Sequence, residues 1–521
     1  MTEEHAPEKP RKHAAGRRAK PSFLSGMLGE RRRTAISFAA GLLVMLLVQI
    51  PAVEQSFLGA PDREMMELAF KLRADVIAGA ANPVLFLDFD DRTLGSLAAR
   101  PFSPPPIATP RGMIAELLTF IRTAPPAEAP RVVIVDVDIG QSNAPVDVVK
   151  AANAPAPATG QPAAQQASPP VDPGVAALQS ALVQWGSSPT APPLIIARQS
   201  FPPQILGVDA PGLALPETPY DDIVARAPNI YWSIVKVLSD QNGVVREFTP
   251  FECVATRRGV QPLFNAALLA YQFDERSPKV LAEAPARHWI VDGQAQCATK
   301  PLQDVTRGER IDFHFSMDTG YEGRVWPDLS PRWPGFSQCH GTDSAIFRRL
   351  SVIDIHNALA SGADLSRALL CQHVVIIGGT NSSDADFVQT PLDQMQGSVV
   401  LANSVRGLEL THGGLRPIPL VFQVLLLALV SIAMTATSVL TARARLGYRG
   451  IRRIRRKRRM RHWLGILALN PLILNGMIAI SAHVLGVLLL AVSLNFGLWG
   501  FLSAPVFAAA ITETAQEFQG G

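Results

Sequence analysis

The chain has 521 residues, of which 18% are charged and 48% are hydrophobic, and its formal net charge is +4. Its mean hydropathy is +0.17, and the apolar excess lies in a few long runs near the two ends. This distribution excludes a chain whose apolar residues serve only as the cores of globular domains, while the length leaves room for roughly two to four domains.

The N-terminal segment is a basic tail followed by the first apolar run. Residues 1–33 contain nine Lys or Arg against four acidic residues, and we expect this tail to be disordered and cytoplasmic. The run at 34–53 has about the length needed to cross a hydrocarbon core roughly 30 Å thick. It lies too far from the N-terminus for an ordinary secretion signal, and no clear small-residue cleavage site follows it. We therefore expect a retained transmembrane helix rather than a buried helix of a globular core.

A pattern of helix, strand, helix and strand follows this run. Residues 62–76 have helical apolar spacing and are expected to extend the membrane helix outward. The next predicted elements are a strand at 83–90, a helix at 113–122 and a strand at 131–138. Continuous apolar strands of this kind are usually covered on both faces, so they indicate an α/β domain with a mostly parallel or mixed sheet flanked by helices.

The α/β pattern is interrupted once. Residues 143–173 are rich in Ala, Pro and Gln and have almost no large apolar residues, which predicts a disordered, solvated insertion. Too few strands lie on either side to close a separate core, so we expect one exported domain at 54–417. The predicted elements after the insertion are a helix at 175–185, a strand at 193–197, a helical segment at 365–370 and a strand at 374–379.

Further apolar runs occupy the C-terminal part of the chain. Their lengths predict transmembrane helices at 418–440, at 464–494 with a preceding interfacial part, and at 497–513. We place the turn between the last two near Leu494 to Gly497. A turn nearer Ser481 to His483 is the alternative.

The distribution of Lys and Arg predicts the orientation, because these residues are retained preferentially on the cytoplasmic side. The loop at 441–463 contains eleven Lys or Arg and no acidic residue. With the tail at 1–33 it carries +16, so the rest of the chain carries −12. Placing both basic segments in the cytoplasm puts the domain at 54–417 in the periplasm or the exterior and the tail at 514–521 in the cytoplasm. This predicts a multi-pass protein of the cell's inner membrane, with four crossings and both termini inside.

All four cysteines fall in the exported stretch, where disulfides can form and persist. They are Cys253, Cys297, Cys339 and Cys371. The connectivity is not readable from the sequence, but proximity favours pairing the first with the second and the third with the fourth. Four buried free thiols are the alternative. The spacing does not suggest zinc.

Four stretches of the exported part carry a resemblance to a known family. They are Asp88-Phe89-Asp90-Asp91-Arg92-Thr93-Leu94 after an apolar strand, Val133 to Asp138, Asp240-Gln241-Asn242-Gly243-Val244-Val245-Arg246, and Ile377-Gly378-Gly379-Thr380 followed by Asp386, Thr390-Pro391, Gly397 and Leu401-Ala402-Asn403. From about Asp62 to Gly413 the chain resembles the CHASE-type extracellular sensory domain of the second class, which is associated with cyclases and histidine kinases.

The resemblance implies one membrane span before the domain and three after it, in agreement with the hydropathy and the charge. The chain departs from the family pattern at Asn242, where Asp is usual, and at Leu401, where His is common. A ligand that depends on that His cannot be bound in the same way here. Members commonly carry a cyclase, kinase or other output module after the last span. Only a short tail follows the last apolar run here, so we expect no output module and no enzyme activity.

Candidate ligand-binding residues lie where predicted strands end, which is where ligands collect in open α/β sheets. The carboxylates among them are Asp88, Asp90, Asp91, Asp136 and Asp138. These can hold a cation or a polar ligand, or they can cap the following helices and hold loops. The closing signature adds Gly378, Gly379, Thr380 and Asp386. A Gly-Gly pair after a strand can let backbone N–H groups approach an anion, but the Lys of a phosphate loop is missing, and a structural role is the alternative.

Two further motifs resemble known functional or structural patterns. An apolar strand that leads into Asp-x-Asp is typical of the phosphatase superfamily with a nucleophilic Asp, but Thr93 stands one residue too far from Asp90 and no later Lys or acidic metal motif completes the set. Gly243 is expected to supply a positive φ in a turn between two strands, with Asn242 before it. We expect no catalytic residue, no metal and no cofactor.

The leading hypothesis is a membrane-anchored sensory protein that recognises an unidentified extracytoplasmic ligand and signals through a separate protein partner. The alternative is a structural or scaffolding subunit of an envelope complex that binds protein partners through the exported domain. Besides fixing the topology, the basic loop can bind anionic membrane lipids. Nucleic acid is not expected as a partner, because no aromatic or folded recognition element accompanies the basic charge.

Overall fold

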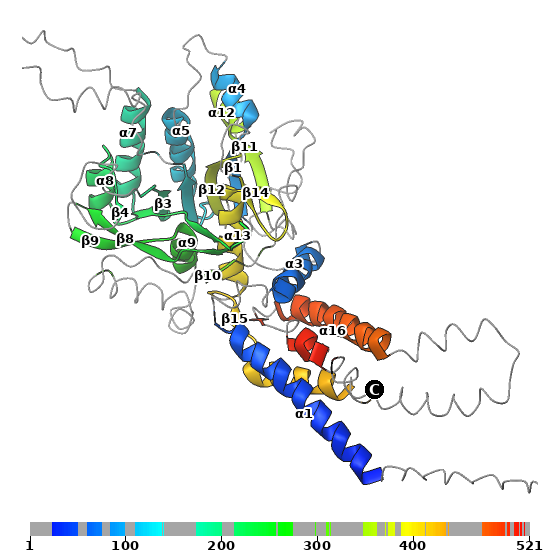
Figure 1. Cartoon of the computed structure of the whole chain (residues 1–521). Helices are drawn as coiled ribbons and strands as arrows, with labels where there is room; N and C mark the ends of the chain where they lie inside the picture. Colours follow the sequence, from blue (N-terminus) through cyan, green and yellow to red (C-terminus); the bar gives the residue numbers. More distant parts are fainter. Residues whose placement is uncertain are drawn as a thin grey trace, which may run out of the picture. The chain divides into compact units, whose positions relative to one another are not determined.

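The structure is a computed structural model. The chain folds into two compact units (Figure 1). The helical unit comprises Met1–Asp62, Pro419–Gly486 and Phe501–Gly521, and the sheet unit comprises Arg63–Ile418 and Val487–Gly500. The residues that the structure describes are 23–50, 60–74, 84–98, 110–137, 139, 173–200, 213–256, 259–274, 297, 309–311, 313, 347–361, 370, 373–380, 387–411, 413–433, 436, 471–494, 498–500, 505–509, 511–512 and 515.

A six-stranded parallel sheet is the centre of the sheet unit. Its strand order is β11-β1-β12-β2-β3-β5, and every neighbouring pair is parallel. The strands are β1 (Val84–Phe89), β2 (Val132–Asp136), β3 (Leu194–Ala197), β5 (Ile230–Ser233), β11 (Phe347–Ser351) and β12 (Val374–Gly379). This sheet confirms the predicted mixed α/β fold. Strands from both sides of residues 143–173 join it, as expected for one core.

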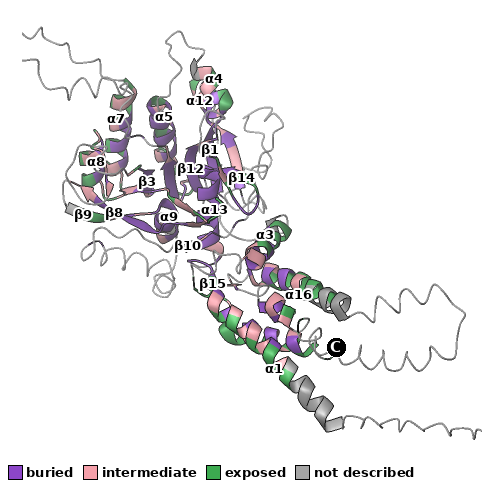
Figure 2. Cartoon of the chain, viewed as in Figure 1, coloured by how far each residue is buried: buried purple, intermediate pink, exposed green. Residues whose placement is uncertain are grey.

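The central strands are buried on both faces because they consist of nearly continuous apolar residues (Figure 2). Side chains alternate between the two faces along each strand. Leu85, Leu87 and Val135 belong to one large core, while Phe86 and Ile134 point to the opposite face. A single strand such as β1 therefore contributes apolar surface to two layers of helices.

Helices cover both faces of the sheet. The first core also contains residues of α5, α7, α8 and α12, whereas α9 and α13 pack against the other face. Helix α4 follows β1 directly and contacts α12. The bounds are α4 (Asp91–Ala98), α5 (Arg111–Arg122), α7 (Pro173–Ser187), α8 (Asp221–Arg226), α9 (Ala266–Asp274), α12 (Val352–Ala360) and α13 (Gly397–Leu410).

Smaller sheets surround the central one. Three have the strand orders β4-β8-β9, β10-β7-β6 and β13-β14, and a fourth joins β15 to β16 in parallel. Helix α3 (Ala60–Ala74) belongs to the sheet unit from Arg63 onward. The strands are β4 (Leu213–Ala214), β6 (Val237–Ser239), β7 (Val245–Phe248), β8 (Phe251–Thr256), β9 (Gly259–Phe264), β10 (Glu309–Arg310), β13 (Phe387–Gln389), β14 (Gln394–Gln396), β15 (Arg416–Pro417) and β16 (Leu498–Trp499).

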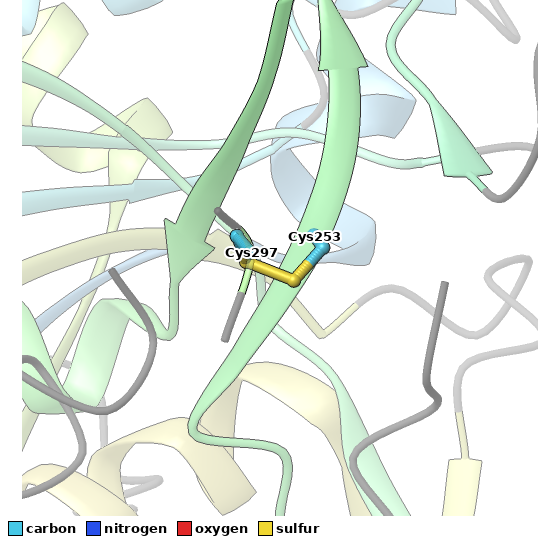
Figure 3. Close-up of a disulfide and its surroundings, with 2 residues drawn as sticks. All are labelled: Cys253 and Cys297. Atoms are coloured by element: carbon cyan, nitrogen blue, oxygen red, sulfur yellow. A yellow bond between two sulfur atoms is a disulfide. The ribbon is translucent and has the colours of Figure 1, made fainter. Parts of the chain in front are cut away.

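A disulfide joins Cys253 on β8 to Cys297, with the two Cα atoms 5.3 Å apart (Figure 3). This is the first of the two pairings favoured by proximity in the sequence. Cys339 and Cys371, the second predicted pair, lie outside the described residues.

Removing this disulfide is expected to destabilise the sheet unit. The bond closes a loop with a sequence separation of 44 residues, so the double variant Cys253→Ser/Cys297→Ser should lower the free energy of unfolding by about 4 kcal/mol if loop entropy dominates. Urea denaturation of the full-length protein measures the loss. Peptide mapping without reductant should recover the two cysteines in one linked peptide pair, and finding both in unlinked peptides would contradict the assignment.

The helical unit contains α1 (Phe23–Val48), a helix over 420–433, the part of α16 (Pro471–Leu494) that precedes Val487, and a short helix over 505–509. Gly41 allows close packing here, because a Cβ at this position would lie 2.7 Å from Leu427 Cδ1 and 2.9 Å from the carbonyl oxygen of Pro505. Large apolar side chains remain exposed on these helices, including Leu43, Leu46, Val421, Phe422, Leu429, Met477 and Ile480.

Within the described residues, no helix has both the length and the apolarity of a membrane span. The four predicted crossings at 34–53, 418–440, 464–494 and 497–513 are not confirmed and stay predictions.

The structure differs from the predicted elements at three boundaries. The tail at 1–33 is not disordered throughout, because α1 begins at Phe23 in a stretch that leads directly into the apolar run. The first helix ends at Val48 rather than at residue 53, as expected for a helix that approaches Pro51. Residues 498–499 form strand β16 rather than the start of a helix, because their backbone pairs with β15.

Candidate functional site

The carboxyl ends of four neighbouring strands place polar residues and a glycine in one row. In the parallel ladders Ser351 of β11 pairs with Asp88 of β1, Asp88 pairs with Gly378 of β12, and Gly378 pairs with Asp136 of β2. Residues in register on parallel strands point to the same face of the sheet. The sheet therefore brings together two predicted carboxylates and the predicted glycine, which are far apart in the sequence.

Asp88 is the most deeply buried carboxylate of this row, with 1% of its surface exposed. Its Oδ2 accepts hydrogen bonds from Arg349 Nε and from Thr380 Oγ1, each at 2.6 Å. Arg349 also donates to the Thr380 hydroxyl, so the three side chains form a closed triangle. The other oxygen, Oδ1, is buried and accepts no hydrogen bond from any residue that the structure describes.

Burial raises the pKa of the Asp88 carboxyl above its ordinary value. The nearby Arg349 charge and the hydrogen bonds from Thr380 and Arg349 lower it only in part, and the charge of Asp90 adds to the increase. A buried carboxyl with a raised pKa, a specific charge partner and a place at the strand ends has the features of a functional residue.

Asp90 serves mainly as a cap. Its Oδ1 accepts hydrogen bonds from Thr93 N at 2.9 Å and Thr93 Oγ1 at 2.7 Å, which is the geometry of an N-cap at the start of α4. The same oxygen accepts a bond from Ser351 Oγ at 2.9 Å and so ties α4 to the end of β11. Asp91 begins α4 with an exposed side chain, where a carboxylate favours the helix N-terminus. For these two residues the structure supports the alternative of helix capping.

Asp136 and Gly378 pack against helix α13 rather than against a loop. Ser398 Oγ of α13 donates to Asp136 Oδ2 at 2.7 Å. A Cβ on Gly378 would lie 2.5 Å from Ser398 Oγ and 3.0 Å from Phe86, so glycine is needed here for the close approach of helix and sheet. Gly379 ends β12 and Thr380 follows it. The predicted site residues Asp138 and Asp386 lie outside the described residues.

Sequence reasoning missed three members of this site: Arg349, Ser351 and Ser398. Arg349 and Ser351 lie on β11, whose sequence Phe-Arg-Arg-Leu-Ser contains two consecutive arginines and does not read as a buried strand. Ser398 lies near the start of α13, next to the Gly397 of the closing signature. Only the pairing of β11 with β1 shows that a guanidinium faces Asp88.

The chemistry of the row favours a polar ligand over a metal ion. Among the residues that the structure describes, no group of three or more His, Cys, Asp or Glu side chains has an arrangement suited to a metal. Arg349 adds a positive charge beside Asp88, which opposes a cation. The groups that remain are one guanidinium, two carboxylates and several hydroxyls, a set whose chemistry suits a ligand that both donates and accepts hydrogen bonds.

The turn at Asp240 is a second ordered motif. Asp240 Oδ1 accepts hydrogen bonds from the backbone N–H of Asn242 at 2.8 Å and of Val244 at 3.1 Å, and Arg246 Nε donates to Oδ2 at 2.9 Å. Gly243 has φ +77°, which confirms the predicted positive φ at this position. Burial alone would raise the pKa of Asp240, but the bonds from Arg246 and the two N–H groups outweigh it and hold the pKa below its ordinary value.

Replacing Asp240 by asparagine should therefore have an effect that depends on pH. Because its folded-state pKa is lowered, Asp240 contributes stability above its ordinary pKa of 3.8, and this contribution is lost as the pH falls through the folded-state value. We expect Asp240→Asn to lower the free energy of unfolding by about 1–3 kcal/mol at neutral pH and by progressively less as the pH falls below 3.8 and through the folded-state value. Urea denaturation across this pH range measures the difference, and a constant gap would contradict the assignment.

Comparison with known families identifies the family of the chain. Residues 39–441 match the model of the CHASE2 domain. The chain belongs to the CHASE2 domain family. CHASE2 is an extracellular sensory domain, so the family confirms the resemblance carried by the four sequence stretches. No curated protein and no solved structure matches the chain.

The matched range includes the row of polar residues at the strand ends. Asp88, Asp136, Gly378 and Thr380 all belong to the CHASE2 domain, and they gather at the carboxyl edge of its parallel sheet. Ligands of open α/β sheets bind at this edge. The edge that carries Asp88 is thus the candidate sensory site of this CHASE2 domain.

Proposed function

We propose that the chain is a membrane-anchored extracytoplasmic sensor whose CHASE2 domain binds a polar ligand at the Asp88 edge of its sheet and signals through a separate protein partner. The observation that carries the proposal is a buried carboxylate oxygen, Asp88 Oδ1, with no hydrogen-bond partner among the described residues of a sensory domain. A buried acceptor without a donor costs about 1–3 kcal/mol, and such groups are retained where they serve a function.

Two properties of the chain support membrane anchoring. Three apolar runs have the length of a crossing, the last of them long enough for two, and the two strongly basic segments lie on one predicted side. The helices of the helical unit also expose large apolar side chains, including Leu43 and Phe422, which suit contact with lipid better than contact with water. The periplasmic or exterior placement of the CHASE2 domain follows from this orientation.

The side chains at the sheet edge support recognition rather than catalysis. Asp88 and Asp90, the two carboxylates that a phosphatase-like site would use, are both engaged: the first with Arg349 and Thr380, and the second as the cap of α4. We assign no catalytic step to them. Signal output is then the task of a protein partner, which binds the cytoplasmic segments or the membrane helices.

Ligand binding can be tested by thermal unfolding of the full-length protein in mild detergent against a panel of small polar compounds. A ligand present at 100 times its Kd stabilises the folded state by about 2.7 kcal/mol and raises the Tm accordingly. The shift should disappear in Asp88→Asn and in Arg349→Lys but persist in Asp91→Asn, a control at the exposed start of α4. An equal shift in wild type and Asp88→Asn would place the ligand elsewhere.

The partner can be identified by crosslinking and mass spectrometry on the same preparation. A kinase, cyclase or regulator attached to the basic loop or the membrane helices supports signalling through a partner. A stable stoichiometric complex with envelope subunits, held through the CHASE2 domain and indifferent to small ligands, would favour a structural role instead.

A further inference from the structure

Three segments that border the predicted membrane crossings contact one small sheet within the sheet unit, directly or through one another. Helix α3 follows the first predicted crossing in the sequence, β15 precedes the second, and β16 lies at the start of the stretch predicted as the fourth. The small sheet is β10-β7-β6, and it contains the Asp240 turn. The contacts between these segments and the small sheet centre on two arginines.

Arg246 of β7 is the first of these arginines. It donates one hydrogen bond to Asp240 Oδ2 and another to Glu67 of α3. The side chains of Arg246 and Asp240 are 11% and 7% exposed, and that of Glu67 is 32% exposed. Ion pairs with this degree of burial are screened less by solvent than surface pairs are. The Asp240 turn is therefore tied to α3 through a single guanidinium.

Arg310 of β10 is the second arginine. Its guanidinium lies 3.8 Å from the centre of the Trp499 ring, a cation–π contact with β16, and its Nη1 lies 3.8 Å from Met66 Sδ of α3. Trp499 in turn pairs with Pro417 of β15, and its carbonyl oxygen accepts a hydrogen bond from the backbone N–H of Ile418. Arg310 thus contacts two of the three bordering segments directly and the third through β16.

Apolar contacts strengthen the attachment of α3. Met65, Ala69 and Phe70 are at most 2% exposed, although α3 lies at the start of the domain. Phe70 packs edge to face against Phe313, with the ring centres 5.9 Å apart, and Phe313 lies three residues after Arg310. The α3 segment is consequently a packed part of the domain and not a free connector.

The small sheet also connects with the candidate sensory site. A parallel bridge joins Val244, at the end of the Asp240 turn, to Gln389 of β13. Strand β13 pairs with β14, and β14 leads directly into α13, where Ser398 donates to Asp136. A change in the position of α13 at the site can reach the turn through these paired strands.

We propose that the β6-β7-β10 sheet is the element that couples the candidate sensory site of the CHASE2 domain to the segments bordering the predicted membrane crossings, with Arg246 and Arg310 as its positioning residues. Breaking the bond between Glu67 and Arg246 loosens α3 together with β15 and β16 and leaves the six-stranded sheet unchanged. The inference rests on the proposed sensory function, because coupling has a purpose only where a stimulus is passed on.

Hydrogen exchange with mass spectrometry on the full-length protein in detergent tests this proposal. Glu67→Gln should raise amide exchange by roughly threefold to tenfold in α3 and also around 416–418 and 498–500, with β1 and β12 unchanged. Asp354→Asn is the matched control, because it removes the exposed ion pair with Arg92 at 2.7 Å and should leave all three segments unchanged. Glu67→Asp, which keeps the charge, should restore part of the protection.

Two results would overturn the proposal. One is an increase confined to α3, because it shows that β15 and β16 do not respond to the Arg246 bond. The other is an increase that extends equally to β1 and β12, because it reports a loss of overall stability. Neither result depends on a ligand or on membrane insertion, so a failure of the coupling is distinguishable from a failure of the proposed function.

Discussion

Replacing Asp88 by alanine is expected to lower the free energy of unfolding of the sheet unit by about 3 kcal/mol. The change removes the acceptor of two buried hydrogen bonds, from Arg349 and Thr380, and the carboxylate that balances a guanidinium with a side chain only 9% exposed. Urea denaturation of the full-length protein, followed by tryptophan fluorescence, measures the loss. A change below ~0.5 kcal/mol would contradict the role assigned to Asp88.

The matched variant Asp88→Asn should be much less destabilised, because the amide oxygen still accepts both bonds and no carboxylate charge is buried. The pH dependence of stability distinguishes the contribution of the hydrogen bonds from that of the buried charge. Because the folded-state pKa of Asp88 is raised, its contribution to stability is fully present below the ordinary value of 3.8 and is lost as the pH rises through the folded-state value. Wild type should therefore lose stability relative to Asp88→Asn as the pH rises through this window, and the opposite trend would contradict the assignment.

Enlarging Gly378 is the second substitution with a large expected effect. A Cβ at this position would lie 2.5 Å from Ser398 Oγ and 3.0 Å from both Ser398 Cβ and Phe86 Cε2, so Gly378→Val should push α13 away from the sheet. Overpacking of this kind costs about 1–3 kcal/mol. The displacement should also weaken the bond from Ser398 to Asp136, which lies within the candidate site. Urea denaturation gives the loss in stability, and ligand-induced thermal shifts give the effect on the site.

Controls for this prediction come from the same chain. Gly112 in α5 has open space where its Cβ would lie, so Gly112→Ala should be neutral or stabilising by up to ~1 kcal/mol. Ser398→Gly removes the nearest clashing atoms, and the double variant Gly378→Ala/Ser398→Gly should be less destabilised than the sum of the two single variants. Strict additivity would show that the two residues do not limit how closely α13 packs on the sheet.

The strands that are apolar throughout could be predicted from the sequence. Strands β1, β2, β3 and β12 coincide with their predicted ranges to within two residues at each end, because a strand buried on both faces has no polar position to interrupt its pattern. The turn at Gly243 could be predicted as well, since few residues other than glycine adopt a positive φ without strain. These features depend on local sequence alone.

The features that depend on pairing between distant strands could not be predicted. Strand β11 carries Arg348 and Arg349 in its middle, and only its pairing with β1 brings Arg349 to Asp88. Similarly, β12 lies between β1 and β2 although more than 200 residues separate it from either in the sequence. The residues that complete the candidate site, Arg349 and Ser398, come from elements of this kind. The strand β16 was missed because its two residues are as apolar as the neighbouring helices.

Selective proteolysis of the full-length protein in the membrane tests the central claim most directly. A tobacco etch virus protease site would be inserted in residues 143–173, and a second variant would carry it in the basic loop at 441–463. We expect protease added outside intact spheroplasts to cut the first variant but not the second, with both fragments of the first staying in the membrane fraction. Cleavage of the first variant only after lysis, or release of either fragment into the soluble fraction, would contradict an exported sensory domain anchored on both sides.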